Sequence, residues 1–168
     1  VASTPKGNKN HIVSKLHFRD ADIHVEFLLP EKGDGNSGVY IHGNYEVQIL
    51  NSYGKEKITQ EDAGALYGFA KPLANACRKP GEWQSYDIIF ESDRYDGDGK
   101  LSKPASVTVI LNGVVLHNKQ AYLGPVRHKE VAAYGKAREP RGPIVLQDHG
   151  NPVRFRNIWI RNLGEYDK

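Results

Sequence analysis

Short stretches of strictly alternating apolar and polar residues are the feature that most limits the fold of this chain. In ADIHVEFLLP (residues 21–30), apolar side chains at 23, 25 and 27 alternate with His24 and Glu26. A period of two is typical of a β-strand with one buried face and does not fit an amphipathic helix. The same pattern recurs in residues 11–18, 45–50, 84–92, 106–118, 144–149 and 153–163.

Turn-forming residues separate these stretches. The chain has 17 glycines and 9 prolines, and we expect hairpins at Gly43-Asn44 and at Asn112-Gly113, the second being a favoured type I′ pair. Residues 51–78 lack clean periodicity and predict a long loop with a short strand near residues 65–67. Many short strands with this punctuation predict an all-β fold, an antiparallel β-sandwich of two sheets.

Composition sets further bounds. The 168 residues predict a single domain spanning 1–168, with residues 1–10 as a loose lead-in. The apolar runs are too short to span a bilayer, and a net charge of +3, concentrated in residues 127–141, argues against a nucleic-acid partner. Cys77 has no cysteine partner within the chain and is interpreted as a packing residue.

Four of the expected strands have polar faces with unusual side chains. An ordinary solvent-facing sheet favours Lys, Thr, Ser and Glu, whereas these faces collect acid, amide, imidazole, phenol and guanidinium groups. Such a set is more typical of a concave sheet that binds a ligand. The residues are Tyr40 and His42, Glu46 and Gln48, Gln147 and His149, and Arg154 and Arg156.

Five segments carry a family signature along nearly the whole chain. They are NSGVYIHGNYEVQIL, GALYG, NACRKPGEWQSYDIIF, LNGVVL and GPIVLQDHGNPVRFRNIWIRNL, in that order. Together they resemble the 3-keto-disaccharide hydrolase domain family. The resemblance implies the jelly-roll sandwich of the concanavalin A-like lectins and glucanases, a carbohydrate substrate, and a bacterial protein exported to the periplasm or the cell exterior.

The resemblance also implies an enzyme that cleaves the glycosidic bond of 3-keto-disaccharides or 3-keto-glycosides. The strand around Glu46-x-Gln48 lacks the second carboxylate of a conventional retaining glycosidase. A ketone at C3 removes the need for that pair, because it acidifies the C2 hydrogen and permits elimination of the glycosidic oxygen followed by hydration. Such a site requires a base, a group that stabilises the enediolate oxygen, and an acid.

The chemistry-bearing residues are assigned to these roles as hypotheses. His149 or Glu46 is the expected base. Arg154 or Arg156, or a divalent cation held by Glu46 with His42 or His149, is expected to stabilise the oxyanion. Asp148 is expected to orient His149 or to protonate the leaving group. The substrate-binding candidates are Asn36, Tyr40, His42, Gln48, Tyr67, Lys71 and Gln147.

Two other readings stay open from the sequence. The alternative function is a non-catalytic carbohydrate-binding module of lectin-like fold, which needs exposed aromatic and amide groups but no base. Trp83 and Trp159 are interpreted as buried core residues rather than sugar platforms.

Overall fold

The structure is a computed structural model that describes residues 10–126 and 132–164, so residues 1–9 of the expected lead-in lie outside it. The described residues form eleven strands and no helix. The strands are β1 (Ile12–Val13), β2 (Ala21–Leu28), β3 (Ser37–Ile41), β4 (Tyr45–Ile49), β5 (Trp83–Glu91), β6 (Arg94–Tyr95), β7 (Leu101–Lys103), β8 (Ser106–Leu111), β9 (Val114–Ala121), β10 (Ile144–Leu146) and β11 (Arg154–Asn162).

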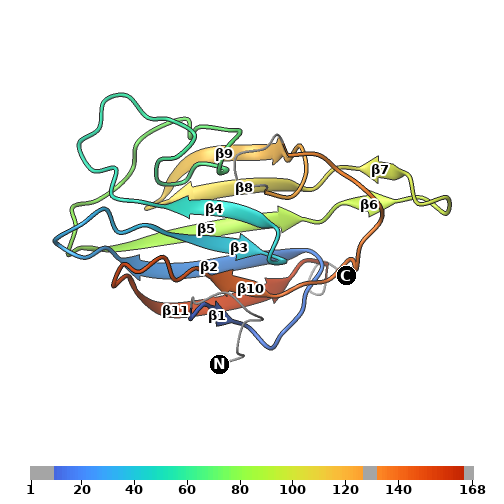
Figure 1. Ribbon diagram of the computed structural model, residues 1–168, viewed down its shortest axis with the longest axis horizontal. Helices are drawn as coiled ribbons and strands as arrows, with labels where there is room; N and C mark the ends of the chain where they lie inside the picture. The colour runs from blue at the N-terminus through green and yellow to red at the C-terminus, as the bar shows by residue number, and fades with distance from the viewer. Residues whose placement is uncertain (1–9, 127–131, 165–168) are drawn as a thin grey trace.

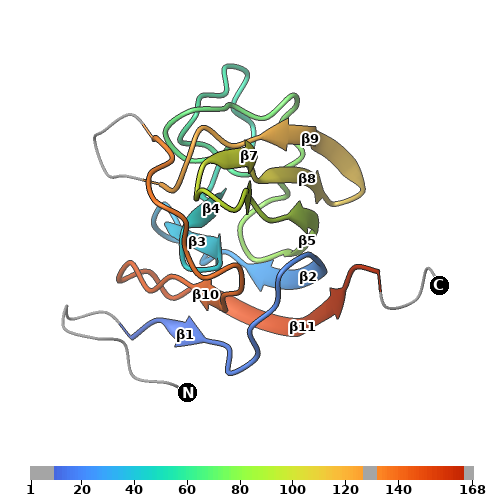
Figure 2. The same ribbon diagram turned by 90° about the vertical axis from the view of Figure 1, so that its right-hand side faces the viewer.

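Two antiparallel sheets pack face to face (Figure 1, Figure 2). One has the strand order β1-β10-β3-β4, and the other has the order β11-β2-β5-β8-β9. The short β6-β7 ribbon projects from one end of the molecule. The predicted all-β sandwich is therefore confirmed. Within the described ranges, no helix has the length and hydrophobicity needed to cross a bilayer.

Alternating residues from both sheets fill the space between them. Ile23, Val25 and Phe27 of β2 are at most 1% exposed, as the period-two pattern predicts. The rings of Phe27 and Tyr86 stack with centroids 5.0 Å apart, which joins β2 to β5 within the core. In β4, by contrast, all five residues are buried. One face of β4 packs into this core. The opposite face is also buried, so residues outside the core must cover it.

The two predicted hairpins form with tight turns. Asn112 and Gly113 both have positive φ, as a type I′ turn requires. Between β3 and β4 the positive-φ residues are His42 and Gly43, and the Asn44 amide donates to the carbonyl of Ile41. The turn is therefore centred on His42-Gly43, one residue earlier than the expected Gly43-Asn44. As a result, the His42 side chain points to the side of the sheet opposite to the one that a continued strand would give it.

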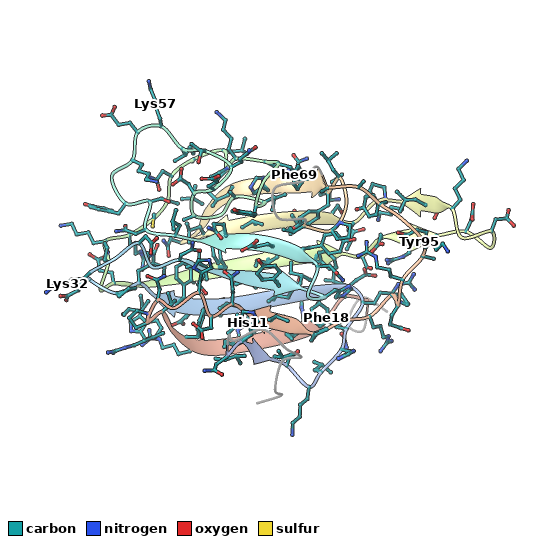
Figure 3. The ribbon with its side chains drawn as sticks, viewed as in Figure 1. His11, Phe18, Lys32, Lys57, Phe69 and Tyr95 are labelled. Atoms are coloured by element: carbon teal, nitrogen blue, oxygen red, sulfur yellow. The ribbon has the colours of Figure 1, made fainter. Side chains whose placement is uncertain are left out.

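The predicted long loop connects β4 to β5 and lies along the free edge of β4 (Figure 1). The amide of Gln48 donates to the carbonyl of Ala65, and the amide of Gly64 donates to the carbonyl of Gln48, both at 2.9 Å. Leu66 forms isolated bridges with Val47 and Ala70, close to the expected short strand. Figure 3 shows Lys57 at the outer tip of this loop and Phe69 where the loop returns beside β9.

Candidate functional site

A small polar pocket lies on the outward faces of β3 and β4, next to the end of β10. Its volume is about 90 Å³, and its lining residues come from β3 and the residue before it, β4, the long loop and the segment after β10. Because these strands are neighbours in one sheet, their alternate side chains meet on one surface. The pocket is lined by Asn36, Tyr40, Glu46, Gln48, Tyr67, Gln147 and His149. All seven are among the residues singled out from the sequence.

Glu46 lies at the bottom of this pocket and is only 3% exposed. It stands opposite Tyr40 in the β3–β4 register, next to the Gly38–Gln48 pair. The missing side chain of Gly38 creates the space for the carboxylate, because a Cβ atom there would lie 2.5 Å from Glu46 Oε1. Sequence reasoning missed Gly38, although a glycine inside a strand often marks a close approach by another group.

A set of neutral hydrogen-bonding groups surrounds the Glu46 carboxylate. With its amide nitrogen facing the available acceptors, Gln48 donates to Glu46 Oε1 at 3.1 Å and to the Ser37 carbonyl at 3.0 Å. The Tyr40 hydroxyl donates to the Glu46 carboxylate, and it accepts from Nε2 of Gln147 at 3.3 Å. This pocket therefore holds Glu46 without a cationic partner among its lining residues.

Burial without a cation changes the acidity of Glu46. Desolvation raises the pKa of Glu46 to about 7, and the hydrogen bond from Tyr40 only partly opposes this effect. Burial, together with the charge and hydrogen bond of Glu46, raises the pKa of Tyr40 far above its usual value, so its hydroxyl stays protonated. Glu46 can consequently accept or release a proton near neutral pH, while Tyr40 remains a hydrogen-bond donor.

Gln147 and His149 lie on the side of the pocket formed by the segment that follows β10. Oε1 of Gln147 is buried and, among the described residues, has no hydrogen-bond donor. His149 is exposed at the rim. A ligand hydroxyl group can donate the missing hydrogen bond to Oε1 of Gln147. The imidazole of His149 can exchange a proton with a ligand at the mouth of the pocket.

Comparison with protein families identifies the chain. A family model described as the 3-keto-alpha-glucoside-1,2-lyase-like domain matches residues 1–161. The chain belongs to this family. The suspected relationship to 3-keto-disaccharide hydrolase domains is thereby confirmed.

Solved structures agree with the lyase-like fold. A candidate glycosyl hydrolase from Parabacteroides distasonis ATCC 8503 is 41% identical, with a TM-score of 0.78 over 91% of this chain and 68% of that one. Two other candidate glycosyl hydrolases of that organism are 22% and 21% identical and share the fold. Their TM-scores are 0.65 and 0.61, over 93% and 94% of this chain and 84% and 78% of theirs. No curated protein matches the chain.

His42 of the lyase-like domain does not lie in the pocket, contrary to expectation. It has a φ of 55° in the type I′ turn, and its ring packs between Phe18 and Phe90, with centroids 5.1 and 5.0 Å away. Burial lowers the pKa of His42 despite backbone hydrogen bonds that favour its charged form. Strand alternation would place His42 on the same face as Tyr40, but β3 ends at Ile41, one residue before His42.

The two arginines are also placed elsewhere, which corrects the expected convergence of four polar faces. β11 pairs with β2 in the five-stranded sheet. Val153 and Phe155 pack against the core, so Arg154 and Arg156 point away from it, on the opposite side of the sandwich from Glu46. Alternation predicts which residues share a face, but it does not predict which sheet a strand joins.

Asp148 and Lys71 are the other expected site residues outside the pocket lining. The carboxylate of Asp148 accepts from the amides of Asn10 at 3.1 Å and Gly150 at 2.8 Å. It lines a separate cavity beside β1, consistent with adjacent strand residues pointing to opposite sides. Lys71 is exposed on the long loop.

The expected metal ligands Glu46, His42 and His149 are not assembled. His42 is in the core, and the part of the chain that the structure describes contains no group of three His, Cys, Asp or Glu side chains able to hold an ion. Of the two expected pairs, Glu46 and His149 both line the pocket, whereas Glu46 and His42 do not meet there.

Proposed function

We propose that this domain cleaves 3-keto-glycosides by eliminating the glycosidic oxygen, with Glu46 as the base that removes the C2 proton. The observation that carries the proposal is the buried Glu46 carboxyl, whose pKa of about 7 places it between its charged and neutral forms under ordinary conditions. The family description supports a 3-keto-glucoside substrate, and the 41% identical candidate glycosyl hydrolase supports cleavage of a glycosidic bond.

The chemistry requires one base and a donor for the developing oxyanion. Glu46 takes the proton from C2, and the C2–H electrons form an enediolate with the C3 ketone. The C1–O bond then breaks as the C1–C2 double bond forms, and the departing oxygen takes a proton. Addition of water across the new double bond completes a net hydrolysis.

The pocket residues fit these steps. Tyr40 donates to the ionised Glu46 at rest, and its hydroxyl is released to stabilise the enediolate once Glu46 is protonated. His149 at the rim is assigned the proton delivered to the leaving oxygen. The amides of Asn36, Gln48 and Gln147 hydrogen-bond the sugar hydroxyls, and the ring of Tyr67 packs against the sugar.

Turnover of 4-nitrophenyl 3-keto-α-glucopyranoside, followed by nitrophenolate release, tests the roles of Glu46 and His149. Glu46→Gln should lower kcat by about 10²–10⁴-fold, the usual contribution of a general base, and His149→Ala should lower it by a smaller factor. Deuterium at C2 should slow the wild-type reaction, because the C2–H bond breaks in the proposed step.

Two control variants test the specificity of that result. Glu91→Gln makes the same chemical change on β5, in the other sheet, and Arg154→Gln removes an arginine that lies across the sandwich. Both should retain wild-type turnover. Full activity in Glu46→Gln and His149→Ala would remove the site assignment, and saturable binding without turnover in the wild type would favour a carbohydrate-binding module. Repeating the wild-type assay with a chelator tests the need for a divalent ion.

A further inference from the structure

Both tryptophans of the chain lie on the outer face of the five-stranded sheet, across the sandwich from the Glu46 pocket. Trp159 is 47% exposed, so its expected burial in the core is wrong. Its ring stacks on His24 at an interplanar angle of 8°, with centroids 5.3 Å apart. The stacked imidazole covers part of one face of the indole, and much of the rest of the ring is open to solvent on the edge strand β11.

A β-bulge places an amide beside the His24 imidazole on which Trp159 stacks. The β11–β2 register shifts between Arg156 and Trp159, and Asn157 within the shift has a φ of 45°. Its Nδ2 donates to Glu26 Oε1 at 2.8 Å and lies 3.4 Å from Nε2 of His24. A bulge of this kind redirects a side chain that a regular strand would point elsewhere.

The charged groups around the ring are paired with one another. Arg156 donates to Glu26 Oε2 at 2.5 Å, and its guanidinium carbon lies 3.9 Å from the centre of the Trp83 ring. His24 Nδ1 lies 2.6 Å from Asp87 Oδ1. Arg161 pairs with Asp22 at the next positions along the two strands. The result is an oriented aromatic ring surrounded by hydrogen-bonding groups whose charges largely compensate.

We propose that this surface, formed by Trp159, His24, Asn157, Glu26 and Arg156, is a second, non-catalytic carbohydrate-binding site for a neutral pyranose. The flat C–H face of the sugar would cover the solvent-exposed part of the Trp159 ring, while its hydroxyl groups exchange hydrogen bonds with the Asn157 amide, the carboxylate and the guanidinium. Compensated charge disfavours an anionic ligand, and the density of ionised groups is unlike the centre of a dry protein interface. The inference rests on the proposed function only for its substrate class.

The test uses the fact that the chain has two tryptophans. A ¹H–¹⁵N spectrum of the intact chain should contain two indole resonances, which Trp83→Phe assigns. Titration with maltotetraose, and separately with cellotetraose, should shift the Trp159 resonance saturably with at least one of them. The shift should persist in Glu46→Gln, because the pocket lies in the other sheet.

Removal of the Trp159 ring tests its own contribution to sugar binding. In Trp159→Ala, saturation-transfer difference spectra should show binding of that sugar weakened by about tenfold, as expected when one stacked ring face is lost. A Trp159 resonance that moves with neither sugar would overturn the proposal, as would broadening with protein concentration alone, which would indicate contact between copies. Catalysis by the Glu46 pocket is measured independently, so either proposal can fail while the other stands.

Discussion

The bare backbone of Gly38 is the neighbour that leaves room for the Glu46 carboxylate. Adding one methyl group in Gly38→Ala would put Cβ 2.5 Å from Oε1 and 3.2 Å from both Cγ and Cδ of Glu46. The acid must then move, whereas the backbone of Gly38 does not lie in the positive-φ region and can accept alanine. We expect turnover to fall by about 10- to 100-fold, since a displacement of ~1 Å suffices for such losses. Kinetics on the 3-keto-glucoside measures this effect.

The matched control for that residue is Gly97→Ala. A Cβ at Gly97 meets nothing within 4 Å, and its backbone is also outside the positive-φ region. It should leave turnover and unfolding unchanged. If Gly38→Ala turned over as fast as Gly97→Ala, the position of the Glu46 carboxylate would not matter to the reaction.

At the scale of elements, the long loop depends on Asp62, which is 1% exposed. Its carboxylate accepts from the Ser52 hydroxyl at 2.9 Å, the Thr59 amide at 2.8 Å and Lys55 at 2.6 Å. Asp62→Ala leaves these donors without their acceptor, which typically costs about 1–3 kcal/mol. We expect faster hydrogen exchange at residues 63–66 and a higher KM, because the same loop carries Tyr67 to the pocket.

Glu61→Ala provides the comparison for that loop. Glu61 is the exposed neighbour of Asp62, and its removal should leave exchange at residues 63–66 unaltered. Equal protection of these amides in the two variants would show that the loop is held by its backbone contacts with β4 rather than by Asp62.

The alternation of residues within each strand explains which site residues could be placed from the sequence. Alternation in residues 45–49 correctly placed Glu46 and Gln48 on one face, and the neighbouring strands brought Tyr40, Gln147 and His149 to it. It failed at His42, where left-handed backbone interrupts the period. It failed again at Arg154 and Arg156, because sheet membership depends on long-range pairing between β11 and β2. The exposure of Trp159 was likewise unpredictable, since residue type alone favours burial.

At the scale of the whole molecule, ionisation of Glu46 opposes folding. Its pKa is 4.5 when unperturbed and about 7 in the folded chain. As pH rises through this window, the unfolded chain loses the proton first, so the free energy of unfolding must fall. The full shift corresponds to about 3 kcal/mol above pH 7. Glu46→Gln should therefore gain stability relative to the wild type between pH 4.5 and pH 7.

Urea denaturation at several pH values measures that difference. Glu91→Gln, at a partly exposed carboxyl on β5 that pairs with Lys103, should follow the wild-type curve. Buried His42 and His117 have lowered pKa values, caused first by desolvation, and they contribute the opposite slope. Their contribution is common to all three proteins and cancels in the comparison. A constant gap between wild type and Glu46→Gln across the pH range would show that Glu46 has an ordinary pKa in the folded chain.

The backbone contacts between β4 and residues 64–66 have a consequence for the behaviour of the protein in a crowded solution. An uncovered edge strand offers its amides and carbonyls to any passing chain and so invites intermolecular sheet growth. Here the amide and carbonyl of Gln48 are already occupied by Ala65 and Gly64. The loop that supplies Tyr67 to the pocket thus also protects the β4 edge from pairing with another chain. A mutation that enlarged the pocket by displacing residues 64–66 from β4 would lower the resistance of the protein to aggregation as well as its selectivity.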